Sequence, residues 1–362
     1  MVKSRAERLM SNVDDMDAVV ILNDGEPFLD STFWYITEQN SGCFEDCIAI
    51  VKRDGSMDVI VNVLEEESAH NGKGNVCVYH DRKERDEFIR NALKGTKKVG
   101  FNIHNSTYAG VAYVKKVVED IEILDATKAI GETVCVKDAK EIEATEKACN
   151  ISSKVASEIP EMLHDGISEK EMAAQMDNRM RLLGGTGNAF DTIAAFGANS
   201  SQPHHMPCDY KIKKGDTALF DFGTKYDRYC SDMTRTVFFG EPPGIMKRAY
   251  EVVLEAQTIG LEEYRDGANA SAADLAARKL IDSTEFKGKF IHSYGHGIGM
   301  DVHQVISISP KSPQILHEGN IVSAEPGVYI PGIGGVRIED TILITKNGYK
   351  RLTSYDHKFT VV

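Results

Sequence analysis

Short apolar runs alternate with amphipathic stretches over about the first 125 residues, which predicts strands and helices in turn. The turn-forming run Arg53-Asp54-Gly55-Ser56 separates two apolar runs and predicts a β-hairpin. Alternating strands and helices are typical of a small α/β domain. The expected strands are 19–22, 47–51, 57–61, 76–79, 99–103 and 121–124, and the expected helices are 81–93 and 108–118.

The pattern changes near residue 138, where longer amphipathic helices begin. Residues 140–163 carry apolar side chains at helical spacing with one charged face, which predicts a long surface helix. Ser168-x-x-Glu171 is a capping box that predicts the start of a second helix, and Gly184-Gly185 predicts its end.

Two more helices are expected at 246–264 and 271–280, the latter opened by a box of the form Ser271-x-x-Asp274. Between and after the helices, segments 190–240 and 290–352 are β-rich and punctuated by glycine. The second domain is therefore expected to be α+β.

Composition narrows the possible functions. The chain of 362 residues has 55 acidic and 42 basic side chains, a net charge of −13, and no basic stripe, which disfavours binding to nucleic acid or to anionic lipid. Its 7 cysteines are odd in number and dispersed, so no disulfide framework is expected, and the Cys43–Cys47 spacing has no matching second pair. No run approaches the ~20 apolar residues of a membrane span, so we expect a reduced, soluble, cytoplasmic protein.

The segment 218–239 predicts a hairpin that carries two acids. Folding about Tyr226-Asp227 places Asp221 opposite Asp232, with their side chains on one face. Two facing carboxylates repel each other unless a cation or a proton lies between them. The alternative is a solvent-facing hairpin with two surface aspartates, but the apolar neighbours favour burial on both faces: Leu219, Phe220, Phe222 and 237–239.

A second predicted hairpin, 321–345, repeats this arrangement. Folding about Gly332 returns Glu325 opposite Glu339 in a β-branched, apolar setting. Between the two hairpins, His296 stands in a turn-like run with glycines at 295, 297 and 299, which let the backbone approach a neighbour closely. A lone histidine is usually structural, but one that accompanies two facing acid pairs is better interpreted as a metal ligand.

Four carboxylates and one imidazole can hold two divalent ions through bridging carboxylates. This oxygen-rich donor set favours Mn²⁺, Co²⁺ or Fe²⁺ over the thiolate-rich sites typical of structural Zn²⁺.

These residues resemble a known family, the pita-bread metallopeptidases, and specifically its proline-directed branch of Xaa-Pro dipeptidases and Xaa-Pro aminopeptidases. The resemblance extends over essentially the whole chain, including the aromatic segment 33–37 and the helix start 136–142. It implies a creatinase-like α/β N-terminal domain at 1–127, a connector at 128–135 and an α+β pita-bread catalytic domain at 136–362. The motifs that carry it are DFG at Asp221, SDMTRT at Asp232, GHGIG at His296, EPG at Glu325 and RIED at Glu339.

The resemblance also implies roles for individual residues. The metal ligands would be Asp221, Asp232, His296, Glu325 and Glu339, with Asp232 and Glu339 bridging and Glu325 also acting as general base. His204 and His303 would contact substrate and the developing oxyanion, and Arg337 would steady the site through carboxylate contacts. The cofactors implied are two divalent ions per chain, Mn or Co first, with Fe or Zn as alternatives.

Some positions depart from the pattern of the branch or duplicate it. Gln304 follows His303 where the branch usually has an acid, and Ser323 stands where threonine is commoner. His205 duplicates His204; we favour His204 for substrate contact because it directly follows Pro203. His292 is expected to be structural.

The implied activity is hydrolysis of the N-terminal Xaa-Pro bond of dipeptides or short peptides by a metal-bridging hydroxide. A dipeptidase is favoured over an aminopeptidase, and a homodimer is expected. The alternatives are a catalytically inactive homologue that acts as a binding protein and a peptidase without proline specificity, such as a methionine aminopeptidase. The presence of all five ligands favours an active peptidase.

Overall fold

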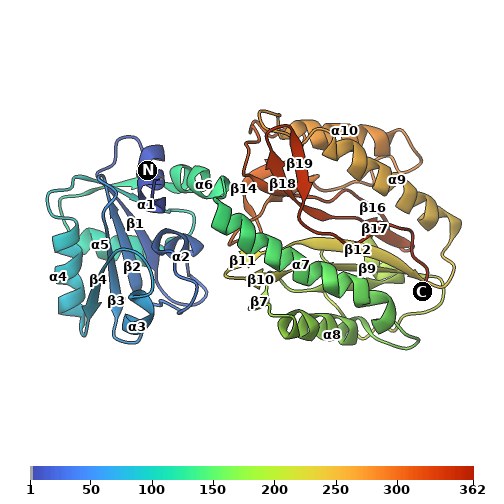
Figure 1. Cartoon of the computed structure of the whole chain (residues 1–362), viewed down its shortest axis with the longest axis horizontal. Helices are drawn as coiled ribbons and strands as arrows, with labels where there is room; N and C mark the ends of the chain where they lie inside the picture. The colour runs from blue at the N-terminus through green and yellow to red at the C-terminus, as the bar shows by residue number, and fades with distance from the viewer. Residues whose placement is uncertain (1–2) are drawn as a thin grey trace. The chain divides into compact units, whose positions relative to one another are not determined.

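The computed structural model describes residues 3–362, which form two compact units with their boundary along the chain between Val134 and Cys135 (Figure 1). Each unit has its own apolar core. None of the helices within residues 3–362 has the length and apolar character that crossing a membrane requires.

The N-terminal unit is built on one six-stranded sheet with the order β4-β3-β2-β1-β5-β6. Strand β2 runs antiparallel to both of its neighbours, and the other adjacent pairs are parallel. The expected strands and the β2–β3 hairpin across residues 53–56 are confirmed. The strands are β1 (Ala18–Asn23), β2 (Cys47–Lys52), β3 (Met57–Asn62), β4 (Asn75–Tyr79), β5 (Lys98–Phe101) and β6 (Glu122–Asp125).

Helices surround this sheet and begin where side chains cap them. The carboxylate of Asp81 accepts from the backbone of Glu84 at the start of α4, and the Thr107 hydroxyl accepts from Gly110 at the start of α5. Both expected helices of this unit are confirmed. The helices are α1 (Arg5–Asn12), α2 (Ser31–Thr37), α3 (Glu66–Ala69), α4 (Arg82–Ala92), α5 (Tyr108–Val117) and α6 (Thr127–Cys135).

The C-terminal unit has four long helices: α7 (Ala139–Met162), α8 (Glu169–Leu182), α9 (Gly244–Leu261) and α10 (Ser271–Asp282). The capping box of Ser168 and Glu171 is confirmed at α8. The box predicted for α10 is wrong, because Ala270 is the N-cap residue and no side chain caps this helix. Asp274 is buried and is instead held by Arg278 at 2.8 Å, which leaves it unavailable for a cap.

The strands of the C-terminal unit form several short sheets. The order β12-β9-β8 defines one, β14-β13-β15-β18-β19 another, and β16–β17 and β11-β10-β7 complete the set. Their bounds are β7 (Gly187–Asn188), β8 (Ile193–Phe196), β9 (Asp216–Phe222), β10 (Thr224–Tyr226), β11 (Tyr229–Cys230), β12 (Met233–Phe239), β13 (Gly295–Gly297), β14 (Gln304–Ile308), β15 (Ile321–Ala324), β16 (Gly327–Ile330), β17 (Gly334–Arg337), β18 (Asp340–Thr345) and β19 (Gly348–Arg351), with a short 3₁₀ helix η1 (Gly197–Ser201) after β8.

These strands lie between α7 and α8 on one side and α9 and α10 on the other (Figure 1). Strand β12 packs on both sides, since Phe238 belongs to the core with α9 whereas Val237 and Phe239 belong to the core with α7 and α8. The expected burial of this hairpin on both faces is therefore confirmed. Because the sheet interior is dry on both sides, any polar group that it carries needs a partner.

The register predicted for the first hairpin is wrong by two residues. Asp221 pairs with Thr234, not Asp232, and the chain turns at Asp227-Arg228. Both turn residues have positive φ, 45° and 70°, as the tight turns that match strand twist require. Asp232 precedes β12 and lies outside the strand ladder.

The register predicted for the second hairpin is confirmed. Ala324 pairs with Asp340 in one sheet and Gly327 pairs with Arg337 in the next, so Glu325 and Glu339 face each other where the two sheets meet. Neither glutamate belongs to a strand, because the ladder is interrupted at this point. Their side chains are thus free to turn toward a common cavity.

A buried ion pair joins β12 to β18. The Arg235 guanidinium lies 2.8 Å from Asp340 Oδ1, with side chains 2% and 0% exposed, and His357 Nε2 lies 2.6 Å from Asp340 Oδ2. Burial alone would raise the pKa of Asp340, but Arg235 and the hydrogen bond from His357 hold it well below its usual range. The pair therefore contributes stability at neutral pH that is lost as pH falls below about 4.

We expect Arg235→Met to lower the free energy of unfolding by about 3–5 kcal/mol at pH 7, because it leaves the buried Asp340 carboxylate without its cation. Urea denaturation followed by circular dichroism measures this loss. The matched control is Arg248→Met, which removes an exposed pair with Glu285 and should leave the unfolding midpoint nearly unchanged. Equal effects of the two substitutions would contradict the importance of the buried pair.

Candidate metal centre

A cavity of about 390 Å³ lies within the C-terminal unit. It gathers all the acids that the sequence singled out, together with four histidines and one arginine. Its polar lining includes Asp221, Asp232, Glu325, Glu339, His204, His292, His296, His303 and Arg337.

Each candidate ligand reaches the cavity from a strand or from a break in a strand ladder. Asp221 comes from β9 and His296 from β13, whereas Asp232, Glu325 and Glu339 stand at the junctions described above. The sequence placed His296 in a turn, and this is wrong, since it occupies a short strand between β14 and β15. Close approach explains the adjacent glycine, because a Cβ at Gly295 would lie 2.3 Å from the backbone oxygen of Ser323.

The donor atoms of the candidate ligands lie close together. His296 Nε2 lies 3.4 Å from Asp232 Oδ2 and 3.3 Å from Glu325 Oε1. Asp232, His296 and Glu339 each offer one donor atom, and these atoms lie within 4.8 Å of one another.

Two carboxylate oxygens in this cluster, Asp221 Oδ1 and Glu339 Oε1, are buried and have no hydrogen-bond partner. Unfilled acceptors on buried anions are costly, and a divalent cation is the group that satisfies them. The residues present therefore fit a metal.

The pKa values of the cluster show how strongly the acids interact. Burial, followed by the charge of Asp221, raises the pKa of Asp232 well above its usual value, and burial with the charge of Asp232 does the same for Glu339. Burial also raises the pKa of Asp221, against the lowering effect of Arg337. Glu325 differs: burial acts to raise its pKa, but the hydrogen bond from His296 lowers it to about 2.

The pKa of His296 shifts in the opposite direction from that of Glu325. Burial acts to lower its pKa, but the hydrogen bond to Glu325 and the charges of Glu325 and Asp232 raise it to about 9. With no metal bound, a proton on His296 thus partly balances the excess negative charge. A metal ion would have to replace that proton, because imidazole ligates as the neutral base.

Arg337 connects the acids to the Tyr329 hydroxyl. It forms an ion pair with Asp221, donates to the Thr234 hydroxyl at 3.0 Å, and donates to the Tyr329 hydroxyl at 2.8 Å. Thr234 in turn donates to Glu339 Oε2 at 2.6 Å. The guanidinium is 3% exposed, so these contacts hold it in one position.

Sequence reasoning missed both Thr234 and Tyr329. Thr234 carried a signal, because it follows Asp232 by two positions and belongs to the same SDMTRT run. Tyr329 carried none, since only the folded β16–β17 pair brings its hydroxyl to Arg337.

Three histidines besides His296 line the cavity. The ring of His303 lies 4.1 Å from that of His296, and burial lowers the pKa of His303. His292 Nε2 lies 2.8 Å from the Tyr329 hydroxyl, so this residue, expected to be structural, belongs to the cavity wall next to Arg337. His204 also lies in the wall, next to Pro203, whose carbonyl is 3.5 Å from the Arg337 guanidinium.

His205 faces a different cluster. Its Nε2 lies 2.7 Å from Glu169 Oε2, and Glu169 also accepts from Cys208 and from the backbone of Phe196 and the side chain of Asn199. Glu169, His205 and Cys208 are spaced closely enough to hold a metal ion. Both oxygens of Glu169 already have hydrogen-bond partners, however, so this cluster is better described as a support for the segment that carries His204.

The two departures from the motif pattern have visible consequences. Gln304 Oε1 accepts from Lys137 Nζ at 2.6 Å, so the side chain is engaged with a lysine. The Ser323 hydroxyl accepts from the backbone of His296 at 3.0 Å and donates to Glu325 Oε1 at 3.2 Å. Serine at this position therefore still links the two candidate ligands.

Comparison with known proteins gives a consistent picture. An Xaa-Pro dipeptidase of Pyrococcus horikoshii is 40% identical over 276 residues, which cover 76% of this chain and 78% of that protein. The solved structure of an Xaa-Pro dipeptidase from Bacillus anthracis is similar with a TM-score of 0.92 at 29% identity, covering 99% of both chains. An X-Pro aminopeptidase from Thermotoga maritima is similar with a TM-score of 0.90 at 29% identity, covering 99% of this chain and 100% of that chain.

Two family models account for the chain. Residues 4–133 match the Creatinase/Prolidase N-terminal domain, and residues 143–346 match Metallopeptidase family M24. The resemblance inferred from the sequence motifs is confirmed, as is the fold class, an α/β N-terminal domain followed by an α+β pita-bread domain. The chain belongs to metallopeptidase family M24.

Proposed function

We propose that this protein hydrolyses the bond between an N-terminal residue and proline in dipeptides, with two divalent metal ions at the acid cluster. The observation that carries the proposal is the convergence of four carboxylates and His296 on one cavity in which two carboxylate oxygens lack partners. The names of the relatives support the proline specificity, because two relatives at 40% and 39% identity over 76% of this chain are named Xaa-Pro dipeptidase, and another at 39% identity is named a putative Xaa-Pro aminopeptidase.

Asp221, Asp232, His296, Glu325 and Glu339 would hold the ions, with Asp232 and Glu339 shared between them. Their oxygen-rich donor set suits Mn²⁺ or Co²⁺. Bound ions would activate a water molecule and polarise the scissile carbonyl. Glu325 would accept the proton, since the hydrogen bond from His296 lowers its pKa and keeps it ionised, and its Oε1 lies 3.3 Å from that candidate ligand.

The remaining groups would bind and orient the peptide. His204 and His303 would donate to the carbonyl oxygen as it gains negative charge, a contact that acts mainly in the transition state. Arg337 would hold Asp221 and the Tyr329 hydroxyl in place. Phe190, Ile193 and Val302 contribute an apolar wall to the cavity, a surface on which a pyrrolidine ring can pack.

A dipeptidase is favoured over an aminopeptidase because the two Pyrococcus relatives, whose matches cover 76% of this chain, carry the dipeptidase name. The similarity to an X-Pro aminopeptidase keeps the second activity as the alternative. The two activities cleave the same bond and differ in whether further residues follow proline in the substrate.

We expect the Mn²⁺- or Co²⁺-loaded enzyme to hydrolyse Xaa-Pro dipeptides faster than Xaa-Pro-Yaa tripeptides and to leave Xaa-Ala dipeptides largely intact. Chelation should abolish turnover and added metal should restore it. The measurement is release of free amino acids, with Asp232→Asn as the inactive control. Equal cleavage of Xaa-Ala would instead indicate a peptidase without proline specificity, and no turnover with both ions bound would indicate a binding protein.

Metal loading should release protons at pH 6–7, because His296, whose pKa is raised to about 9, must lose its proton to ligate as the neutral base, and the raised pKa values of Asp232 and Glu339 act in the same direction. Titration calorimetry with Mn²⁺ in two buffers of different ionisation enthalpy measures the number released. The number should fall as pH rises, since fewer protons then remain to be displaced. Absence of proton release at pH 6 would contradict these protonation states.

His204→Ala should lower kcat by about 10²–10³-fold with a much smaller change in KM, since an oxyanion donor acts in the transition state. His303→Ala should act in the same direction with a smaller effect. His205→Ala is the matched control, because His205 bonds Glu169 and not the cavity. Steady-state kinetics with metal content measured alongside decides the matter: a severe loss at His205 with none at His204 would reverse the assignment.

A further inference from the structure

The N-terminal unit contains a second cavity, of about 950 Å³, for which the proposed peptidase activity provides no role. Ligand pockets in proteins typically enclose about 300–1,000 Å³. Asp24 follows β1, Tyr79 ends β4, and the segment 104–110 follows β5, so the cavity lies at the carboxyl ends of three strands that run in one direction. In α/β sheets this edge is where ligands usually bind.

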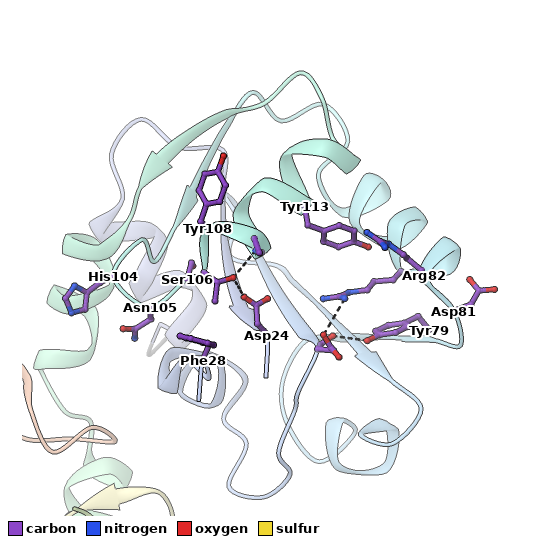
Figure 2. Close-up of a pocket in the computed structure, with 15 residues that line it drawn as sticks. Asp24, Phe28, Tyr79, Asp81, Arg82, His104, Asn105, Ser106, Tyr108 and Tyr113 are labelled. Atoms are coloured by element: carbon purple, nitrogen blue, oxygen red, sulfur yellow. Dashed lines mark hydrogen bonds and ion pairs between the residues drawn. The ribbon is translucent and has the colours of Figure 1, made fainter. Parts of the chain in front are cut away.

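Aromatic rings stand on both sides of the cavity. Figure 2 shows Phe28 and Tyr108 on one side of Asp24, and Tyr79, Tyr113 and Arg82 on the other. Phe28 is 56% exposed and Tyr108 is 90% exposed, which is unusual for large aromatic side chains. Such rings offer flat faces for a planar ligand.

Two arginines of α4 line the same cavity, and both lie against tyrosine rings. The guanidinium of Arg82 lies 5.0 Å from the centre of the Tyr113 ring and has no ion pair among residues 3–362. The guanidinium of Arg85 lies 5.2 Å from Tyr113 and 5.5 Å from Tyr79. Spacing of three residues places both side chains on one face of the helix.

Arg85 is the group that most needs an acceptor. Its side chain is only 16% exposed, and its closest carboxylate within the described residues, Asp46, is 3.8 Å away, too far for a hydrogen bond. Its Nε is buried without a partner, as is the hydroxyl oxygen of Ser106 in the same cavity. One of the five guanidinium donors is therefore buried and unmet, and an unmet donor in a largely buried position is costly.

The acids that line the cavity do not meet this need. Asp81 accepts from the backbone of Glu84 as the N-cap of α4, and Asp24 accepts the Thr107 hydroxyl at the start of α5. The carboxylate of Asp46 is 67% exposed, and its ion pair with Arg85 is long, at 3.8 Å. The starts of α4 and α5 both lie at the cavity, and the positive ends of their dipoles add to the arginines in favouring an anion.

We propose that this cavity binds a small organic anion, a carboxylate or phosphate joined to a planar ring, with the anionic group on Arg85 and Arg82 and the ring against the exposed aromatic side chains. The cavity lies within the N-terminal unit, and the inference goes beyond the proposed peptidase activity. The anionic oxygens of the ligand would accept charge-assisted hydrogen bonds from the Arg85 guanidinium, whose Nε has no acceptor among the described residues.

The test uses ligand-observed NMR on the full-length, metal-loaded chain with four probes: phenyl phosphate, benzoate, inorganic phosphate and neutral benzamide. We expect phenyl phosphate or benzoate to bind with a dissociation constant below about 1 mM, and inorganic phosphate and benzamide to bind more weakly. Comparison of the affinities for phenyl phosphate and benzoate shows whether the site prefers a phosphate or a carboxylate. Arg85→Gln should weaken binding about tenfold or more, since it removes a charged donor.

Lys83→Gln is the matched control, because it removes the same charge from an exposed position of α4 outside the cavity and should leave binding unchanged. Tyr108→Ala changes a side chain that is 90% exposed, so it should fold normally and still weaken binding of the ring-bearing probes. The proposal is overturned if no probe binds below about 1 mM, or if Arg85→Gln and Lys83→Gln bind equally well. Equal affinity for phenyl phosphate and inorganic phosphate would overturn the role of the rings, and equal affinity for benzoate and benzamide would overturn that of the charge.

Discussion

Electrostatic repulsion among four buried carboxylates is the constraint around which the C-terminal unit is organised. Asp221, Asp232, Glu325 and Glu339 share one cavity, and three of them have raised pKa values because burial and their neighbours disfavour the charged form. A protein keeps such a cluster only if cations are available to it. Inside the chain these are Arg337 and the protonated His296, and the unfilled oxygens of Asp221 and Glu339 define where further positive charge belongs.

The fold answers this constraint with breaks in its strand ladders. A continuous ladder would project Glu325 and Glu339 on the sheet face among β-branched neighbours, but interruption between β15 and β16 and between β17 and β18 lets both turn to the cavity. Behind this layer, Asp340 follows Glu339 directly and is neutralised by Arg235 and His357. The two adjacent acids therefore differ in their partners. Arg235 and His357 satisfy the carboxylate of Asp340, whereas Glu339 Oε1 has no hydrogen-bond partner.

The sequence predicted the second hairpin correctly because a symmetric fold about Gly332 follows from the pattern of residues alone. The predicted register of the first hairpin was wrong because Asp227 and Arg228 form the turn with positive φ, and no glycine in the sequence marks that position. The error of two residues kept Asp221 on the correct face, since side-chain direction repeats every two positions. Tyr329, by contrast, is connected to the site only through tertiary contacts with Arg337 and His292, so no local pattern could indicate it.

Unpartnered polar atoms distinguish the sites of this molecule better than residue type does. The cluster of Glu169, His205 and Cys208 has the composition of a metal site, but every oxygen of Glu169 is already bonded, so it supports structure. The acid cluster leaves acceptors unfilled and is therefore suited to cations. The N-terminal cavity leaves the Nε donor of Arg85 unfilled and is suited to an anion. A buried polar group without a partner is unfavourable in the isolated chain, so the unmatched atoms that line these two cavities indicate ligands of opposite charge.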